Sequence, residues 1–526
     1  MHPILISAIV TAVLVVWIAV VLAINVKRHP QGLFTLFFAE LWERFSFYGM
    51  RALLVLYMTK ALAYDDTKAY AVYAAYGALV YTTPAIGGLI ADRLIGYQRA
   101  IMIGAIFMAI GHFVLAIEHE VFFYAALAFL IVGNGFFKPN ISSLVGKLYP
   151  EGDARRDGGF TLFYMGINAG AFLAPLWCGV IGETYGWHYG FGLAGVGMVA
   201  GLVVFAVRRH VFGDKGLPPD QAALAKPILP GINISTAVVA AAVIAVPLMG
   251  LLVRFDRKIV FPVGAEGFSP GTILTLLLAL VAIVVVGGVL VSAFKGPKVE
   301  RERIFVALIL TAFSVIFWAF FEQAGSSISL FTDRNVNRVV FGAEVPASTF
   351  QALNPAFILV FAPILAGLWV WLSKVGREPS TPFKFVLGIV QLGLGFGVMV
   401  VGARAAGSDG IVPVIYLVIG YLLHTTGELC VSPVGLSMVT KLAPLKMVGL
   451  MMGVWFLSSA FAHNVGGIIA ALTSAPNVEG AAVTDPALTL PLYSGVFNSL
   501  FYVSLGTAAV LLLLVPVLKK WMHGVR

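Results

Sequence analysis

Two carboxylates and two guanidinium groups stand close together in residues 40–51, which read ELWERFSFYGMR. The polar members of this run recur at the spacing of one helical face, and they are Glu40, Glu43, Arg44, Tyr48 and Arg51. Ionisable side chains at membrane depth are costly, and they normally face a cavity or partner charges along an ion or substrate path. The run therefore indicates a helix that lines a transport path.

The composition places the whole chain in a membrane. Of its 526 residues, 60% are hydrophobic and 11% are charged, whereas soluble domains carry about 25% charged residues. Fifteen stretches are long enough to cross a bilayer as helices, which takes about 20 residues each. They lie near residues 4–26, 34–60, 69–92, 99–117, 121–146, 159–183, 188–208, 233–253, 270–294, 304–326, 354–373, 383–403, 411–438, 448–473 and 492–518.

The basic residues indicate how these spans are oriented. With the N-terminus outside and the C-terminus in the cytoplasm, 23 of the 34 Lys and Arg residues fall in inside loops and three lie within helices. The eight outside are Lys60, Lys68, Arg254, Arg257, Lys258, Arg334, Arg338 and Arg404. This asymmetry fits the positive-inside rule for a cytoplasmic membrane. It also accounts for the net charge of +9, so no nucleic-acid partner is expected.

The spans divide into two sets of six with additions. We expect an extra N-terminal helix in residues 1–30, a six-helix bundle in 31–211, a linker with two inserted helices in 212–300, and a second six-helix bundle in 301–526. Six plus six helices is the arrangement in which two repeats enclose a site near the middle of the membrane. The predicted fold class is thus an all-α integral membrane protein.

The loop between the third and fourth spans, residues 87–99, reads GGLIADRLIGYQR. Its glycines allow close helix contact, and Asp92 can pair with Arg93, Arg99 or a neighbouring helix end. We expect Asp92 and Arg93 to latch one conformation at the cytoplasmic side. An ordinary charged turn is the alternative.

Several motifs now point to a known family. The loop at Asp92 resembles the signature GxxxADRxxGxR of the major facilitator superfamily. The first charged run resembles the ExxERFxYYG motif of the proton-dependent oligopeptide transporter family, with Phe47 in place of the first tyrosine. Further matches follow in order: GNGFFKPN at 133–140, FYMGINAG at 163–170, FWAFFEQ at 317–323, GELCVSP at 427–433 and VWFLSS at 454–459. The resemblance covers roughly residues 30–520. It implies the major facilitator fold and a proton-coupled symporter that imports di- and tripeptides by alternating access.

A dipeptide carries an ammonium group at one end and a carboxylate at the other, so a cavity that receives it needs opposite charges on opposite walls. Arg51 and Lys138 in the first half can bind the carboxylate, and Glu322 and Glu428 in the second half can bind the ammonium. The resemblance implies that Arg51 pairs with Glu322 in an outside-facing gate and that Lys138 pairs with Glu428 in an inside-facing one. Static pairs that only hold helices together are the alternative.

Glu40, Glu43 and Arg44 lie two to three turns earlier on the same helix as Arg51. One guanidinium cannot neutralise two carboxylates, so one of the two is a candidate proton carrier. Which carboxylate carries the proton stays open. A packing cluster without proton exchange is the alternative.

Other positions match the family's substrate cavity. The polar ones could bond the peptide backbone or its termini, and they are Tyr48, Tyr76, Asn168, Asn354 and Ser459, with Tyr81 as a weaker addition. Trp318, Trp455 and Phe456 could line side-chain pockets. Interhelical hydrogen bonds and packing are the alternatives for these two groups.

Histidine and cysteine give little chemistry here. Animal members of the family carry a histidine on the helix equivalent to 69–92, but residues 69–91 contain none, which moves the proton chemistry to the carboxylates. His424 and His463 could face the core, but we expect them to be buried in the packing between helices. Cys178 and Cys430 both fall within spans and suggest neither a disulfide nor a metal site.

The sequence contains no HExxH, Walker loop or Ser-His-Asp order, so neither an enzyme nor an ATP-driven pump is expected. No cofactor is expected either, protons being the coupling ion, and we expect the monomer to be functional. An importer of another small zwitterion or anion, such as an amino acid or nitrate, remains open on the same fold. An intramembrane enzyme would need a nucleophile or metal constellation that the sequence lacks.

Overall fold

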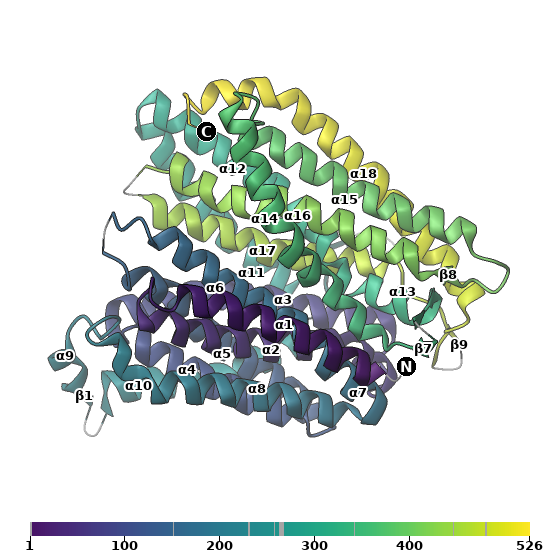
Figure 1. Ribbon diagram of the computed structural model, residues 1–526, viewed down its shortest axis with the longest axis horizontal. Coiled ribbons are helices and arrows are strands. Elements are labelled where there is room, and N and C mark those ends of the chain that lie inside the picture. The colour runs from purple at the N-terminus through teal and green to yellow at the C-terminus, as the bar shows by residue number, and fades with distance from the viewer. Residues whose placement is uncertain are drawn as a thin grey trace. The chain divides into compact units, whose positions relative to one another are not determined.

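The computed structural model describes residues 3–150, 152–229, 232–256, 258–261, 268–340, 342–444, 447–478 and 481–525. Four residues that the sequence analysis covers lie outside these ranges: Arg257, Lys446, Arg526 and Gly231 of the linker. Helices dominate the described chain (Figure 1). They are α1 Pro3–Asn25, α2 Gln31–Lys60, α3 Asp66–Ile90, α4 Tyr97–Leu115, α5 Glu120–Lys147, α6 Arg156–Ala174, α7 Val180–Tyr185, α8 Trp187–Val207, α9 Gln221–Ala225, α10 Ile234–Arg254, α11 Ile273–Lys295, α12 Lys298–Phe321, α13 Ser327–Asn335, α14 Leu353–Lys374, α15 Thr381–Ala405, α16 Val414–Leu442, α17 Val448–Ala471 and α18 Pro486–Trp521.

Fourteen helical spans in the described chain are long and apolar enough to cross a membrane. The remaining long helix is α2, which carries Glu40, Glu43, Arg44 and Arg51 in its middle and Lys60 at its end. These fifteen helices correspond to the fifteen predicted spans. The prediction of an all-helical membrane fold is therefore confirmed.

The strands are short and connect helices. Antiparallel pairs form between β1 and β2, β3 and β4, β6 and β7, and β9 and β10, whereas β5 pairs with β8 in parallel. Their bounds are β1 Pro227–Leu229, β2 Ile232–Asn233, β3 Lys258–Phe261, β4 Phe268–Thr272, β5 Val336–Asn337, β6 Val339–Val340, β7 Ala343–Glu344, β8 Val412–Pro413, β9 Asn477–Val478 and β10 Ala481–Ala482.

Four spans of the described chain change their helical winding partway, one of them through the 3₁₀ turn η5 (Ala347–Ala352) before α14. A π-turn, η1 (Ala91–Ile95), extends α3 to Gly96, whose φ of 76° ends the span. A second π-turn, η2 (Pro175–Gly179), joins α6 to α7 at Pro175, because proline lacks the N–H that an α-helix needs there. A 3₁₀ turn, η4 (Glu322–Gly325), joins α12 to α13. Glu322 thus begins a tighter turn, which the sequence did not predict.

Contacts divide the chain into two compact units. Unit 1 comprises residues 1–62, 79–255 and 338–355, and unit 2 comprises 63–78, 256–337 and 356–526. The two inserted helices belong to different units, since α10 packs on α5 in unit 1 and α11 packs on α17 in unit 2. The predicted domain bounds of 31–211, 212–300 and 301–526 stay a prediction.

Small residues bring the helices of unit 1 into close contact. A Cβ placed on Gly87 of α3 would lie 2.0 Å from the carbonyl oxygen of Gly135 on α5, and one placed on Gly104 of α4 would lie 2.6 Å from that of Gly133. Such spacing lets backbones pack directly, as in many membrane helix pairs. α5 is thereby held between α3 and α4.

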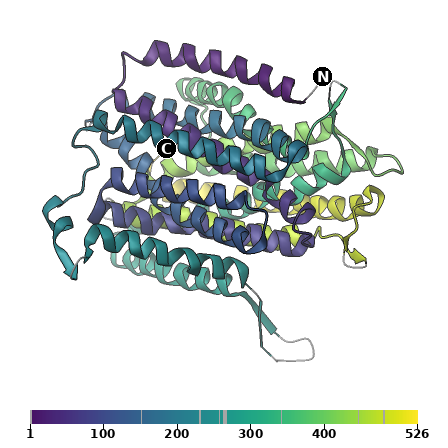
Figure 2. The same ribbon diagram turned by 90° about the horizontal axis from the view of Figure 1, so that it is seen from below.

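The extra helix α1 runs beside the rest of unit 1 (Figure 2). Two hydrogen bonds attach it to η2: Ser7 Oγ donates to the Leu176 carbonyl over 2.9 Å, and Trp177 Nε1 donates to Thr11 Oγ1 over 2.9 Å. Most of its remaining side chains are exposed or half-buried. Within its unit, α1 is therefore a peripheral addition.

Candidate functional site

Three of the charged residues of α2 form one buried cluster in unit 1. The exposed fractions are 2% for Glu40, 0% for Glu43 and 3% for Arg44. Arg44 donates to both carboxylate oxygens of Glu43 through Nε and Nη2, and its Nε lies 3.2 Å from Glu40 Oε1. The arrangement places a buried cation against two carboxylates, which together carry one more negative charge than it can neutralise.

The neighbouring helix α6 encloses this cluster. A Cβ on Gly170 would lie 2.1 Å from the Leu41 carbonyl oxygen and 3.0 Å from Arg44 Cβ. Glycine at this position therefore lets α6 approach α2 beside the guanidinium. The Phe47 ring is the other close neighbour, with its centroid 5.3 Å from Arg44 Cζ.

The two carboxylates of the cluster differ in their bonding. Both oxygens of Glu43 accept hydrogen bonds from Arg44. Glu40 Oε2 is buried, and it has no hydrogen-bond partner within the described residues. A buried unpaired oxygen is costly as a carboxylate and less so as a protonated acid. Glu40 is thus the better suited of the two to take up a proton.

The other two cations of unit 1 that the sequence assigns to transport lie over aromatic rings. Arg51 Cζ lies 5.6 Å from the centroid of the Tyr48 ring, one turn earlier on α2. Lys138 Nζ on α5 lies 4.7 Å from the centroid of the Tyr81 ring on α3. Cation–π contacts hold a charge without neutralising it.

In unit 2, Glu322 and Glu428 are both buried, with exposed fractions of 7% and 9%. Glu322 stands directly after α12 and Glu428 lies within α16. Glu322 Oε2 lies 3.8 Å from His463 Nε2 on α17. Arg51 and Lys138 belong to unit 1, so their pairing with Glu322 and Glu428 stays a prediction.

A buried ion pair in unit 2 was missed by the sequence reasoning. Arg334 at the end of α13 donates to both oxygens of Asp66 at the start of α3, over 2.7 Å each. Asp66 Oδ2 also accepts from the Ala475 backbone N–H over 3.0 Å, and Arg334 donates to the Tyr493 hydroxyl over 3.2 Å. Both residues stand at the ends of spans, where charges are normally solvated. No signal in the sequence distinguished them from loop charges.

The polar substrate candidates make local contacts. Asn168 Nδ2 donates to the Tyr164 carbonyl of its own helix over 2.9 Å, and the carbonyl of Ser459 lies 3.1 Å from His463 Nδ1. Tyr76 is buried on α3, whereas Asn354 is half-buried on α14. Their contact with substrate stays a prediction.

The aromatic candidates differ in exposure. Trp455 is buried, and a Cβ on Gly435 of α16 would lie 2.1 Å from its ring. Trp318 is half-buried with its ring edge-on to Phe317 and Phe321. Phe456 is 47% exposed. Trp455 is therefore held firmly by helix packing, while Phe456 has the least contact with its own unit.

The predicted cytoplasmic latch lies in the π-turn η1. Asp92 and Arg93 are both exposed, and the Tyr97 hydroxyl hydrogen-bonds to Asp92. The role of this turn as a latch stays a prediction.

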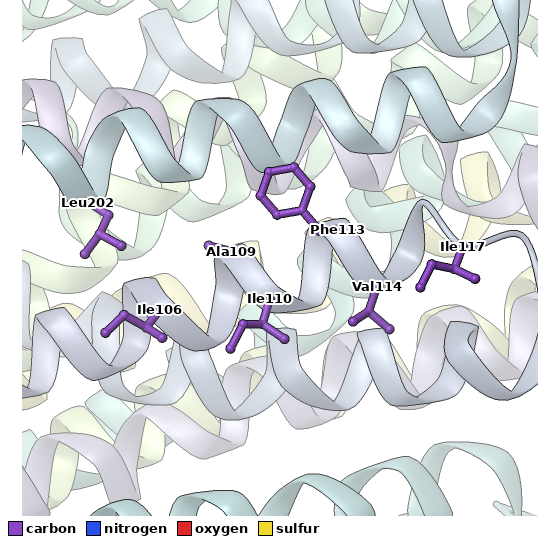
Figure 3. A pocket seen from close by; sticks show the side chains of 7 residues that line it. All are labelled: Ile106, Ala109, Ile110, Phe113, Val114, Ile117 and Leu202. Atoms are coloured by element: carbon purple, nitrogen blue, oxygen red, sulfur yellow. The ribbon is translucent and has the colours of Figure 1, made fainter.

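Two hollows within unit 1 are apolar and lie apart from the charged cluster. One, of about 380 Å³, lies on α4 and is closed on one side by a residue of α8 (Figure 3). Its lining is Ile106, Ala109, Ile110, Phe113, Val114, Ile117 and Leu202. The other, of about 560 Å³, lies between α3, α5 and α10. Neither contains a charged residue, so neither can receive a charged ligand. Within the described residues, no group of three or more His, Cys, Asp or Glu could hold a metal ion.

Comparison with known proteins supplies the family. Residues 98–485 match the POT family, the proton-dependent oligopeptide transporters. The chain is 39% identical over 507 residues to the uncharacterized transporter YclF of Bacillus subtilis, covering 94% of this chain and 96% of that protein. It is 35% identical over 496 residues to dipeptide and tripeptide permease B of Shigella dysenteriae, with the same coverage. The crystal structure of a mutant peptide transporter POT in complex with alafosfalin is similar, with a TM-score of 0.77 at 38% identity, covering 94% of this chain and 96% of that one. The chain is thus a transporter rather than an enzyme, and it belongs to the POT family.

Proposed function

We propose that this protein imports di- and tripeptides together with protons by alternating access across a bacterial cytoplasmic membrane. The observation that carries the proposal is the buried cluster of Glu40, Glu43 and Arg44, in which two carboxylates share one guanidinium within a largely apolar helix. Membership of the POT family and the similarity to a dipeptide and tripeptide permease support the choice of substrate.

The charged candidate residues of the two units could bind the two oppositely charged ends of a zwitterion. Arg51 and Lys138 offer cations on unit 1 for the peptide carboxylate, and Glu322 and Glu428 offer carboxylates on unit 2 for its ammonium group. We assign the same four residues to two gates, Arg51 with Glu322 towards the outside and Lys138 with Glu428 towards the inside. Protonation of a carboxylate would remove the electrostatic reason for its gate to stay closed.

The remaining predicted residues would complete the cavity. The hydrogen-bonding candidates are Tyr48, Tyr76, Asn168, Asn354 and Ser459, and the aromatic ones are Trp318, Trp455 and Phe456. Asp92 and Arg93 would latch the cytoplasmic side. We further propose that the N-terminus lies outside, the C-terminus lies in the cytoplasm, and the monomer is functional.

Uptake into liposomes tests the proposal. The purified protein is reconstituted, an inward proton gradient is imposed, and the uptake of labelled dialanine is measured with and without a protonophore. We expect accumulation that the protonophore abolishes. Absence of dialanine uptake, combined with uptake of a labelled amino acid or nitrate, would replace peptides by that substrate.

A variant pair then tests the coupling role of Glu322. Glu322→Gln removes the buried carboxylate, and we expect it to abolish proton-driven accumulation. Glu344→Gln is the matched control, because the Glu344 side chain is 69% exposed. Full accumulation by Glu322→Gln would exclude Glu322 as a gate.

A further inference from the structure

We propose that His463 and Glu322 form one shared proton-binding site, and that His463 thereby sets the pH range over which uptake runs. This inference rests on the proposed function and adds a residue to its proton chemistry. It adds a histidine to a mechanism that the sequence analysis assigned to the carboxylates.

The two side chains face each other inside unit 2. His463 Nε2 on α17 lies 3.8 Å from Glu322 Oε2 at the start of η4, and the two side chains are only 6% and 8% exposed. A small side-chain rotation would bring these atoms within hydrogen-bonding distance, since such bonds measure about 2.7–3.2 Å. Low exposure keeps bulk water from replacing this contact.

A second contact determines which ring nitrogen of His463 is protonated, and so whether the nitrogen that faces Glu322 can accept a proton. His463 Nδ1 lies 3.1 Å from the Ser459 carbonyl oxygen, one turn earlier on α17. A carbonyl oxygen can only accept a hydrogen bond, so Nδ1 carries the proton in the neutral ring. Nε2 then presents its lone pair towards Glu322. The neutral imidazole is therefore oriented to accept a proton from the Glu322 carboxyl group.

The position of the ring depends on a glycine of α3. A Cβ on Gly77 would lie 1.9 Å from His463 Cδ2 and 2.9 Å from Nε2. No side chain could stand at position 77 without moving the imidazole. The glycine therefore makes the room in which the ring can face Glu322.

Glu322 lies at ion-pairing distance from His463, and the elements packed around α17 carry further ionisable groups. α16 contributes His424 and Glu428, and α11 carries only Lys295 at its far end. The other charges of α12 lie in its first two turns. The part of α3 in unit 2 adds Asp66, Lys68, Tyr70, Tyr73 and Tyr76.

The proposed step moves one proton and breaks no other bond. In one form Glu322 is a carboxylic acid and His463 is neutral; in the other the proton has passed from the Glu322 oxygen to Nε2, leaving a carboxylate beside an imidazolium. Both forms contain the same single proton, so the pair titrates as a unit. Because the proton can reside on either side chain, the pair binds it more tightly than the Glu322 carboxylate would alone.

The test measures proton-driven uptake of labelled dialanine in liposomes as a function of external pH. His463→Asn keeps a polar side chain of similar length but cannot titrate. We expect its half-maximal uptake to move to more acidic pH by about one unit or more. His424→Asn is the matched control, because this histidine is also buried but its ring lies tilted against that of Phe396, with the ring centroids 4.6 Å apart. Its pH profile should equal that of the unchanged protein.

Exchange of labelled for unlabelled dialanine without a gradient shows that each variant is folded and binds peptide. An unchanged pH profile in an exchange-competent His463→Asn protein would overturn the inference while leaving the proposed function intact. Absence of uptake by the unchanged protein would instead overturn the proposed function.

If His463→Asn fails to exchange, Gly77→Ala takes its place, because the added methyl displaces the ring. The same acid shift is then expected, and an unchanged profile overturns the inference.

Discussion

At the scale of single residues, the unequal bonding of Glu40 and Glu43 separates their roles. Arg44 donates to both oxygens of Glu43, whereas Glu40 keeps one buried oxygen without a partner in the described chain. Protonating Glu40 would therefore break no hydrogen bond at that oxygen. The sequence left open which carboxylate carries the proton, and the bonding favours Glu40.

The first prediction compares Glu40→Gln with Glu43→Gln, each of which replaces a carboxylate by an amide. Glu40→Gln should keep exchange of labelled dialanine but lose accumulation under a proton gradient, because it removes the titrating group and keeps an acceptor for Arg44. Glu43→Gln should lower the free energy of unfolding by about 3 kcal/mol or more, since it leaves a buried guanidinium poorly paired. Liposome uptake and melting temperature in detergent measure the two effects. Normal accumulation by Glu40→Gln would exclude it as the proton carrier.

The pair of Asp66 and Arg334 gives the second prediction. The two side chains are 0% and 5% exposed and bond through two parallel contacts. Asp66→Asn would leave a buried cation, which costs about 3–5 kcal/mol, so the melting temperature should fall. Lys298→Gln is the control in the same unit, because the Lys298 side chain is 75% exposed in its ion pair with Glu302 and exposed pairs contribute at most about 1 kcal/mol. Equal melting temperatures for the two variants would contradict the prediction.

At the scale of helices, hydrophobic length predicted the fifteen long helices because the bilayer sets how many apolar residues a span needs. α2 required its periodic pattern as well, since its charges interrupt the apolar sequence. The nine-residue α13 was not predicted, being too short and polar to give a hydropathy signal.

The contacts of the site residues were harder to predict from the sequence than the helices were. The cluster on α2 follows from helical spacing within twelve residues. Asp66 and Arg334 are separated by 268 positions, and nothing local to either residue identifies the other. The contact between Glu322 and His463 likewise depends on how α12 and α17 pack, which a single sequence does not determine.

Close packing of α3 on α5 leads to the third prediction. A methyl group on Gly87 would lie 2.0 Å from the Gly135 carbonyl oxygen, so Gly87→Ala should push the helices apart and cost about 1–3 kcal/mol. Gly88→Ala is the adjacent control, because its methyl would lie 3.5 Å from Pro139, an ordinary contact. Melting temperatures in detergent compare them. Equal stability of the two variants would show that α3 and α5 tolerate wider spacing.

At the scale of the whole molecule, the two termini would lie on opposite sides of the membrane if each of the fifteen long helices in the described chain crosses it once. The distribution of basic residues predicts which side each one occupies. Cysteine labelling can test this, because the two native cysteines, Cys178 and Cys430, are both buried and should give little background with a reagent that does not cross the membrane.

The fourth prediction assigns one side to each of two exposed positions. Lys298, the first residue of α12, is predicted to face the cytoplasm, and Asp409, between α15 and α16, is predicted to face outside. In intact cells, a membrane-impermeant maleimide should therefore label Asp409→Cys and spare Lys298→Cys, and permeabilised cells should show both labelled. The reverse pattern would invert the orientation. It would also move the Arg51 end of α2 to the cytoplasmic side, so that the pairing of Arg51 with Glu322 could no longer serve as the outer gate.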